Sequence, residues 1–223
     1  MTKTPTKPQE SKATERPAGT AMLKIERPDF RIIALRIEGT APLVINRFSA
    51  KAMEMMRASQ EAGSVAKSRK VREPKNFDQL YHDAKHISTQ GWEGFSAPSI
   101  RNACISACRT CGVVMTKAKL ALVVLADGVD LVDGTPLIRI EGKAEKLESH
   151  VRNQTGVADI RARPIYREWA ATLRIRYDAG MLDAESVVSL LVRVGMQVGI
   201  GEGRPDSKDS CGMGWGTFNV VSF

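Results

Sequence analysis

The stretch W-A-A-T-L-R-I-R-Y, residues 169–177, alternates between the two sides of a β-strand almost without interruption. One side is apolar, and the other carries Thr172, Arg174 and Arg176. A period of two is typical of a strand with one face in the core and the other face open. The stretch therefore predicts a half-buried strand whose open face is basic.

Other segments supply the remaining strands of a small sheet. Residues 31–38 (RIIALRIE) alternate in the same way, and residues 118–126 (AKLALVVLA) form an apolar run. Residues 217–221 (TFNVV) provide a short strand near the C-terminus. We therefore expect four strands in the sheet, and residues 136–141 (PLIRIE) predict an additional one.

Two segments have the spacing of helices. Residues 96–111 begin with capping serines and an early proline, carry a stripe of small apolar residues, and end before Gly112. Residues 183–198 begin with Asp183, a helix cap, and repeat apolar residues on one side. The order of elements predicts an α+β fold with a ferredoxin-like (RRM-like) βαββαβ core. Its four-stranded antiparallel sheet is covered by the two helices on one face.

The rest of the chain divides around this core. Residues 1–29 are rich in Thr, Lys, Pro, Glu and Ser, and this composition predicts a disordered N-terminal arm. The domain then spans 30–223, with one basic insertion at about 44–95, the thumb, and another at about 127–168, the web. We expect two short helices in the thumb and irregular structure over most of the web.

The charge of the chain points to a polyanionic partner. The net charge is +8 and the pI is about 9.5. Eight basic and three acidic residues lie between Arg47 and Lys75, whereas three basic and six acidic residues lie between Tyr177 and Phe223. Segregation of this kind is typical of a binding track for nucleic acid.

The segment 199–216 contains six glycines and predicts a specialised loop before the last strand. Glycine adopts positive φ and allows close approach of a backbone, so the loop can expose N–H groups beside Arg204 and Lys208. That arrangement suits a phosphate-bearing ligand. The same composition also suits a flexible surface loop, and the sequence leaves both interpretations open.

Basic, aromatic and glycine positions form the predicted nucleic-acid site. The run at 67–72 is either a solvated loop or a phosphate contact, and the absence of an acid within it favours phosphate binding. Arg161, Arg163 and Arg167 lie near Tyr166 and Trp169, which offer planes for stacking of bases or, for Trp169, a place in the core. The predicted binding residues are Arg47, Lys51, Lys67, Arg69, Lys70, Arg72, Arg101, Arg161, Arg163, Arg167, Arg174, Arg176, Gly201, Gly203, Arg204, Lys208 and Trp215.

Candidate catalytic and metal-binding residues have simpler interpretations. His82 and His86 have the spacing of an acid–base or metal-ligand pair, but histidines on a polar helix are commonly surface residues. The cysteines at 104, 108 and 111 share one helical face, which small buried residues against a sheet explain as well as a metal does. The chain lacks Walker, HExxH and GxSxG motifs. We therefore expect no catalytic residues, no metal and no cofactor.

Three features carry a resemblance to a known family. They are Thr40-Ala-Pro-Leu43 after the first strand, Pro98-Ser-Ile-Arg-Asn-Ala103 at the first helix, and the glycine-rich loop before the last strand. The chain resembles the repeat-associated mysterious protein (RAMP) superfamily, which includes the backbone subunits of CRISPR effector complexes that polymerise along a guide RNA. It is also similar to small phage and prophage proteins that share the runs at 163–169 and 199–205. RNA-cutting members use a histidine or an aspartate that has no counterpart here.

These observations predict a non-enzymatic, sequence-nonspecific protein that binds single-stranded nucleic acid and assembles as repeated subunits. It is either a phage coating or annealing protein or a CRISPR-type backbone subunit. The alternatives are a viral structural or assembly protein without nucleic-acid binding, and a RAMP-type ribonuclease. No hydrophobic run resembles a signal peptide or a membrane span, so we expect the cytoplasm of a bacterial host. The expected partners are RNA or DNA single strands, further copies of the chain, and effector or recombination proteins.

Overall fold

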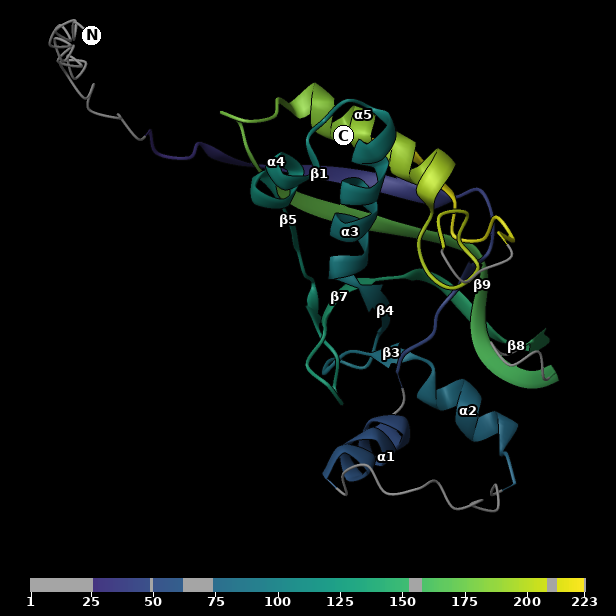
Figure 1. The fold of residues 1–223 in the computed structure, drawn as a ribbon. Helices are drawn as coiled ribbons and strands as arrows, with labels where there is room; N and C mark the ends of the chain where they lie inside the picture. The colour runs from purple at the N-terminus through teal and green to yellow at the C-terminus, as the bar shows by residue number, and fades with distance from the viewer. Residues whose placement is uncertain (1–25, 49, 62–73, 153–157, 208–211, 223) are drawn as a thin grey trace, which may run out of the picture.

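The computed structural model describes residues 26–48, 50–61, 74–152, 158–207 and 212–222. Helices combine with two antiparallel sheets, so the predicted α+β class is confirmed (Figure 1). The strands of the larger sheet are β1 (Phe30–Gly39), β2 (Leu43–Val44), β5 (Leu122–Leu125), β8 (Glu141–Arg152), β9 (Ala158–Asp178) and β10 (Phe218–Ser222). Among the described residues, no helix has the length and apolarity needed to cross a lipid bilayer.

The centre of the larger sheet is the pair β1 and β9. Their antiparallel register places Leu35 opposite Leu173. Strand β10 pairs with the other edge of β1. Strand β5 pairs with the C-terminal end of β9, where Leu122 lies opposite Tyr177. The strands in this part of the sheet therefore follow the order β10, β1, β9, β5.

Two helices cover one face of these strands, α3 (Ala97–Ala107) and α5 (Ala184–Arg193), as Figure 1 shows. The predicted alternation is confirmed, because Leu173 and Ile175 are buried under the helices whereas Arg174 and Arg176 are exposed on the opposite face. The predicted cap of α5 is also present: the Asp183 side chain accepts a hydrogen bond of 2.7 Å from the amide of Ser186. Burial of the apolar side of α5 fixes the helix on the sheet.

One predicted strand begins later than expected. Residues 115–121 form the helix α4 (Met115–Ala121), and β5 starts only at Leu122. Ala118 and Ala121 are fully buried three residues apart, whereas Leu120 between them is 71% exposed. The apolar run at 118–126 thus consists of the buried side of a helix and then a strand, and the prediction of one continuous strand was wrong.

The web is also more regular than predicted. Strands β8 and the first half of β9 form a long hairpin in which Glu148 lies opposite Ala162. Most side chains of β8 are polar and exposed, so no period of two marked it in the sequence. The predicted extra strand is present as β7, but it belongs to a second sheet with the order β3, β4, β7, β6. Those strands are β3 (His86–Ile87), β4 (Glu93–Ser96), β6 (Gly128–Val129) and β7 (Pro136–Arg139).

The thumb contains the two predicted short helices, α1 (Ala50–Glu61) and α2 (Phe77–Asp83). In Figure 1 they lie beside the second sheet, away from α3 and α5. Arg47, just before α1, connects this region to the second sheet through an ion pair with Asp130. The predicted basic run at 67–72 and the N-terminal arm up to residue 25 lie outside the described residues.

Candidate nucleic-acid interface

The loop 199–216, named the Gly-rich loop below, is held between α3 and the pair β2–β9. A π-helical turn (Val194–Val198) leads into it, and the amide of Gly199 donates 2.8 Å to the carbonyl of Val194. The amide of Glu202 donates a hydrogen bond of 2.9 Å to the carbonyl of Val44 in β2, and the amide of Gly216 donates one of 2.8 Å to the carbonyl of Pro42. The described part of the loop is therefore anchored by backbone hydrogen bonds at both ends.

Gly201 and Gly203 are required by close packing within the protein itself. Both have positive φ, 77° and 76°. A Cβ atom at Gly201 would lie 2.5 Å from the Val44 carbonyl oxygen, and one at Gly203 would lie 2.5 Å from the indole ring of Trp215. These glycines therefore let the loop seat on β2 and let the half-exposed Trp215 ring pack against it.

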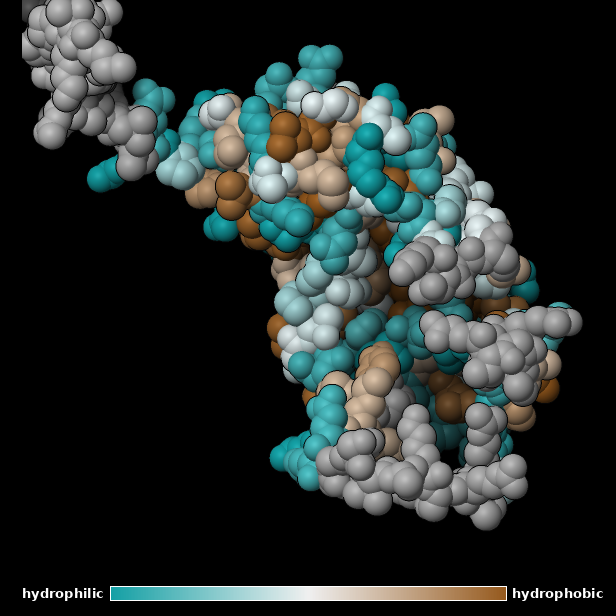
Figure 2. All heavy atoms as spheres, viewed as in Figure 1, coloured by the Kyte–Doolittle hydropathy of each residue, from teal (hydrophilic) through white to brown (hydrophobic). Residues whose placement is uncertain are grey.

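A groove of about 210 Å³ separates the loop from α3. Helix α3 contributes three polar side chains at helical spacing, and the loop contributes backbone and two charged side chains. In the space-filling view, exposed apolar residues gather over α4 and α5, whereas hydrophilic residues surround the end of α3 (Figure 2). The groove is lined by Ser99, Asn102, Ala103, Ser106, Val198, Gly199, Ile200, Gly201, Arg204 and Asp206.

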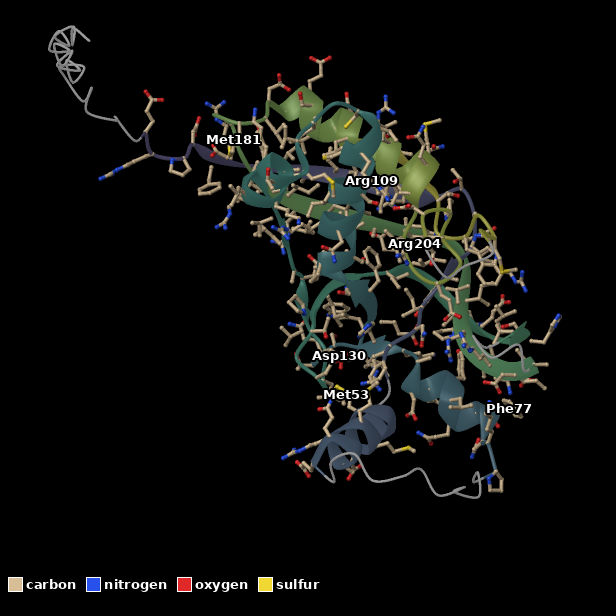
Figure 3. The ribbon with its side chains drawn as sticks, in the orientation of Figure 1. Met53, Phe77, Arg109, Asp130, Met181 and Arg204 are labelled. Carbon is tan, nitrogen blue, oxygen red and sulfur yellow. The ribbon has the colours of Figure 1, made fainter. Side chains whose placement is uncertain are left out.

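Arg204 is the basic side chain that lines this groove, and its charge contributes to lowering the pKa of Asp206 in the same groove. Its Nη1 donates 3.2 Å to the Gly201 carbonyl, and in the part of the chain that the structure describes no carboxylate lies within 4 Å of its guanidinium. Figure 3 shows Arg204 in the loop and Arg109 near α3. A half-exposed guanidinium held by a carbonyl keeps N–H donors for a phosphate.

Asp206 occupies the α3 side of the groove. Its carboxylate accepts hydrogen bonds from the Ser106 hydroxyl and, at 2.5 and 2.6 Å, from Nη2 of Arg109. The Ser106 hydrogen bond lowers the pKa of Asp206, Arg109 lowers it further, and partial burial opposes both. Asp206 is therefore held in its charged form.

Glu202 occupies the sheet side of the loop in the same manner. Its carboxylate lies 2.9 Å from Nε of Arg163 and 3.5 Å from Nη1 of Arg161. Both arginines belong to β9 and point to the same side of the strand, since they are two residues apart. The structure thus brings together six predicted binding residues around the loop: Arg161, Arg163, Gly201, Gly203, Arg204 and Trp215.

Two other predicted arginines have structural partners elsewhere. Arg47 is 9% exposed, and its guanidinium contacts Asp130 at 3.5 Å and the Asp83 carbonyl at 3.0 Å. Arg101 donates to the carbonyls of Lys119 and Leu122 at the C-terminal end of α4. In this structure both side chains are engaged away from the groove.

The open face of the sheet carries the remaining predicted arginines. Arg174 pairs with Asp127 at 3.1 Å, Arg167 pairs with Glu145 at 2.8 Å, and Arg176 lies over the Phe30 ring. A hollow of about 670 Å³ on this face is lined by four acidic and three basic residues. Its charged residues are Arg36, Glu38, Glu141, Lys143, Glu145, Arg167 and Glu168. The near balance of charge makes this face a poorer phosphate track than its arginines suggested.

Some predicted residues fall outside the described part of the chain. Lys67, Arg69, Lys70, Arg72 and Lys208 lie there entirely, and the Lys51 side chain is not described although its backbone belongs to α1.

The histidine and aspartate cluster of the second sheet serves as a structural junction. Nδ1 of His86 lies 2.7 Å from Asp130, and Asp133 brings a third possible metal ligand within 4.8 Å. The other oxygen of Asp130 already accepts the Val132 amide at 2.8 Å and faces Arg47. A guanidinium beside the central carboxylate disfavours a metal cation, so the cluster instead ties β3 to the β6–β7 turn.

The cysteines of α3 belong to the core. Burial raises the pKa of the Cys104 thiol to about 12 and contributes most to raising that of Cys108 to about 11. Both side chains are buried among the apolar residues between helix and sheet. Cys111 is half-buried, and Cys211 lies outside the described residues.

The sequence interpretation missed the groove residues of α3 and the acids of the loop. Ser99, Asn102 and Ser106 recur at helical spacing beside the small apolar stripe, and this signal is present in the sequence. The roles of Glu202 and Asp206 leave no such signal, because their partners are distant in the sequence. No protein-family model matches the chain, and no curated protein matches it significantly.

Proposed function

We propose that the protein binds the sugar–phosphate backbone of single-stranded nucleic acid along the Gly-rich loop, in the groove beside α3. The observation that carries the proposal is Arg204, a guanidinium without a carboxylate partner among the described residues, on the edge of a groove lined by Ser99 and Asn102. Guanidinium, hydroxyl and amide groups are the usual donors to phosphate oxygens, and the Ser99 hydroxyl would exchange the hydrogen bond of 2.6 Å that it donates to the Ser96 carbonyl. The strand therefore runs past Arg204 with its phosphates towards the loop.

Binding of this kind is independent of sequence. The donors around the loop suit phosphates, which carry no base information. The half-exposed Trp215 ring beside Gly203 adds a stacking surface, and every base has a face that stacks on an aromatic ring. The same site accepts RNA and DNA strands but disfavours a duplex, whose bases are already stacked.

The core supports this proposal through its topology. We infer a ferredoxin-like βαββαβ core from β1, α3, β5, β9, α5 and β10, since their order in the chain and the strand order β10, β1, β9, β5 agree with that topology. The resemblance to RAMP proteins adds assembly as repeated subunits along the strand, in the cytoplasm of a bacterial host. The protein then acts as a phage coating protein or a CRISPR-type backbone subunit, without catalysis.

A polarisation titration tests the proposal. Labelled single-stranded RNA, single-stranded DNA and duplex are titrated with the protein at several salt concentrations. The variant Arg204→Gln is expected to weaken single-strand binding and to reduce the salt slope by about 0.7, the value for one lost contact to a single strand. Arg176→Gln, on the open sheet face, is the matched control and should leave the slope unchanged.

Two outcomes overturn the proposal. One is an absence of salt-dependent strand binding by the unaltered protein, and oligomers in that case support the alternative of an assembly protein. The other is a larger loss for Arg176→Gln than for Arg204→Gln, which places the strand on the open sheet face.

A further inference from the structure

The acids of the Gly-rich loop occupy the arginines on both of its sides. Glu202 holds Arg161 and Arg163 of β9, and Asp206 holds Arg109 after α3. The loop therefore places two carboxylates against three guanidiniums, one pair on its α3 side and two on its sheet side. Of the four arginines Arg109, Arg161, Arg163 and Arg204 around the loop, Arg204 is the one with no carboxylate within 4 Å among the described residues.

We propose that Glu202 and Asp206 are internal competitors for nucleic-acid phosphates and lower the affinity of the site for a strand. This inference rests on the proposed function. Carboxylates and phosphates present similar oxygens to a guanidinium, and both accept bidentate hydrogen bonds. A bound strand takes over the three arginines, and each displaced carboxylate turns to water.

The effect on different ligands follows from the position of the two acids. They act on opposite sides of the loop, so a ligand with one phosphate can displace only one of them. A strand presents successive phosphates and displaces both, with Arg204 as the first contact. The acids therefore lower the affinity for a strand more than the affinity for a mononucleotide or inorganic phosphate.

The exposure of the partners makes displacement feasible. The side chains of Glu202 and Asp206 are 26% and 33% exposed, and those of Arg109 and Arg161 are 54% and 36% exposed, whereas that of Arg163 is 14% exposed. Ion pairs in contact with water contribute little net stability, because solvent screens them. The exchange of a carboxylate for a phosphate therefore costs little free energy at Arg109 and Arg161 and more at Arg163.

A purely structural role predicts the opposite effect on binding. If the ion pairs held the loop in position, their removal would disorder the site and weaken the strand. The loop has separate anchors, since the amide of Glu202 donates to Val44 and that of Asp206 donates 3.2 Å to Val198. Neutral amide side chains in place of the acids therefore leave the loop in place.

The test compares three variants that each remove one negative charge. Glu202→Gln and Asp206→Asn alter the loop, and Glu145→Gln alters the Glu145–Arg167 pair on the open sheet face, 2.8 Å long in this structure. Binding of a labelled single strand is measured against salt, and thermal unfolding verifies the fold. Glu202→Gln frees two guanidiniums, so we expect about tenfold tighter binding at low salt and a slope steeper by about 1.4. Asp206→Asn frees one, and the expected steepening is about 0.7.

Competition by a mononucleotide completes the test. In a double variant that combines Glu202→Gln with Asp206→Asn, the strand gains more contacts than the mononucleotide does, so the mononucleotide should displace the strand less readily than from the unaltered protein. The inference is wrong if both loop variants bind no more tightly than Glu145→Gln, or if they weaken binding while remaining folded. That outcome is distinct from failure of the proposed function, in which the unaltered protein shows no salt-dependent strand binding.

Discussion

Gly216 and Ile200 meet at the two ends of the Gly-rich loop, where a Cβ atom on Gly216 would lie 1.8 Å from the carbonyl oxygen of Ile200. The amide of Ile200 also donates 3.0 Å to the Gly216 carbonyl. The two residues therefore close the loop at its base, and the contact leaves no space for a side chain at position 216. The described part of the loop is thus a fixed part of the fold as well as a candidate binding element.

The first prediction compares two glycines of this loop. Gly214 also has positive φ, 75°, but nothing lies within 4 Å of its Cβ position. Gly214→Ala should lower the free energy of unfolding by about 1 kcal/mol, the usual cost of a left-handed conformation. Gly216→Ala adds a clash with backbone and should lower it by more than about 3 kcal/mol. Urea denaturation measures both, and equal losses would contradict the proposed closure of the loop.

The second prediction concerns the junction at the base of the thumb. Asp130 is buried, and its carboxylate contacts Arg47, which is 9% exposed, as well as His86. Asp130→Ala leaves a buried guanidinium unpaired and should lower the free energy of unfolding by about 3–5 kcal/mol. Asp133→Ala, at an exposed neighbour, should change it by less than about 1 kcal/mol. Denaturation curves measure both variants, and similar small losses for the two would show that Asp130 does not stabilise the fold through Arg47.

The parts of the fold that the sequence predicts have apolar residues at a regular spacing. The alternation at 169–177 and the helical spacing of Leu190, Leu191 and Val194 reflect burial of one side against the core, and all three leucine and valine side chains are buried. Strand β8 left no such trace, because it pairs with β9 at the margin of the core and keeps polar side chains on most positions. Strands β3 and β6 have two residues each, too few to show any period.

The candidate site was predictable to a lesser extent. Glycine content and Arg204 indicated the loop, because both signals are local in the sequence. Charge counts cannot show which arginines already have partners: Arg163 and Glu202 are 39 residues apart and meet only in the folded chain. For the same reason, Arg47 was counted as a surface cation although it lies in the interior.

The third prediction concerns thiol reactivity. Raised pKa values, about 12 for Cys104 and about 11 for Cys108, leave almost no thiolate near pH 8. In a Cys211→Ser background, we therefore expect Cys111 to react first with iodoacetamide in the folded protein and all three thiols to react after unfolding. Mass spectrometry locates the modified residues. Rapid modification of Cys104 in the folded protein would show that α3 is not packed on the sheet as described.

The last prediction uses the lowered pKa of Asp206, which results first from the Ser106 hydroxyl and then from Arg109. A lowered folded-state pKa means that the charged carboxylate stabilises the fold above the ordinary Asp pKa, and that this contribution is lost as the pH falls through the lowered value. Near neutral pH, the free energy of unfolding of the unaltered protein should therefore exceed that of Asp206→Asn by about 1 kcal/mol or less. This difference should shrink only at acid pH. Denaturation curves across pH measure this difference, and a difference that persists at the acid end would show that the carboxylate charge is not its source.

The affinity of the unaltered protein for the strand should rise over the same acid range in which this stability is lost. Protonation of Asp206 releases Arg109, so the tighter binding of Asp206→Asn should disappear as the unaltered protein reaches the same affinity.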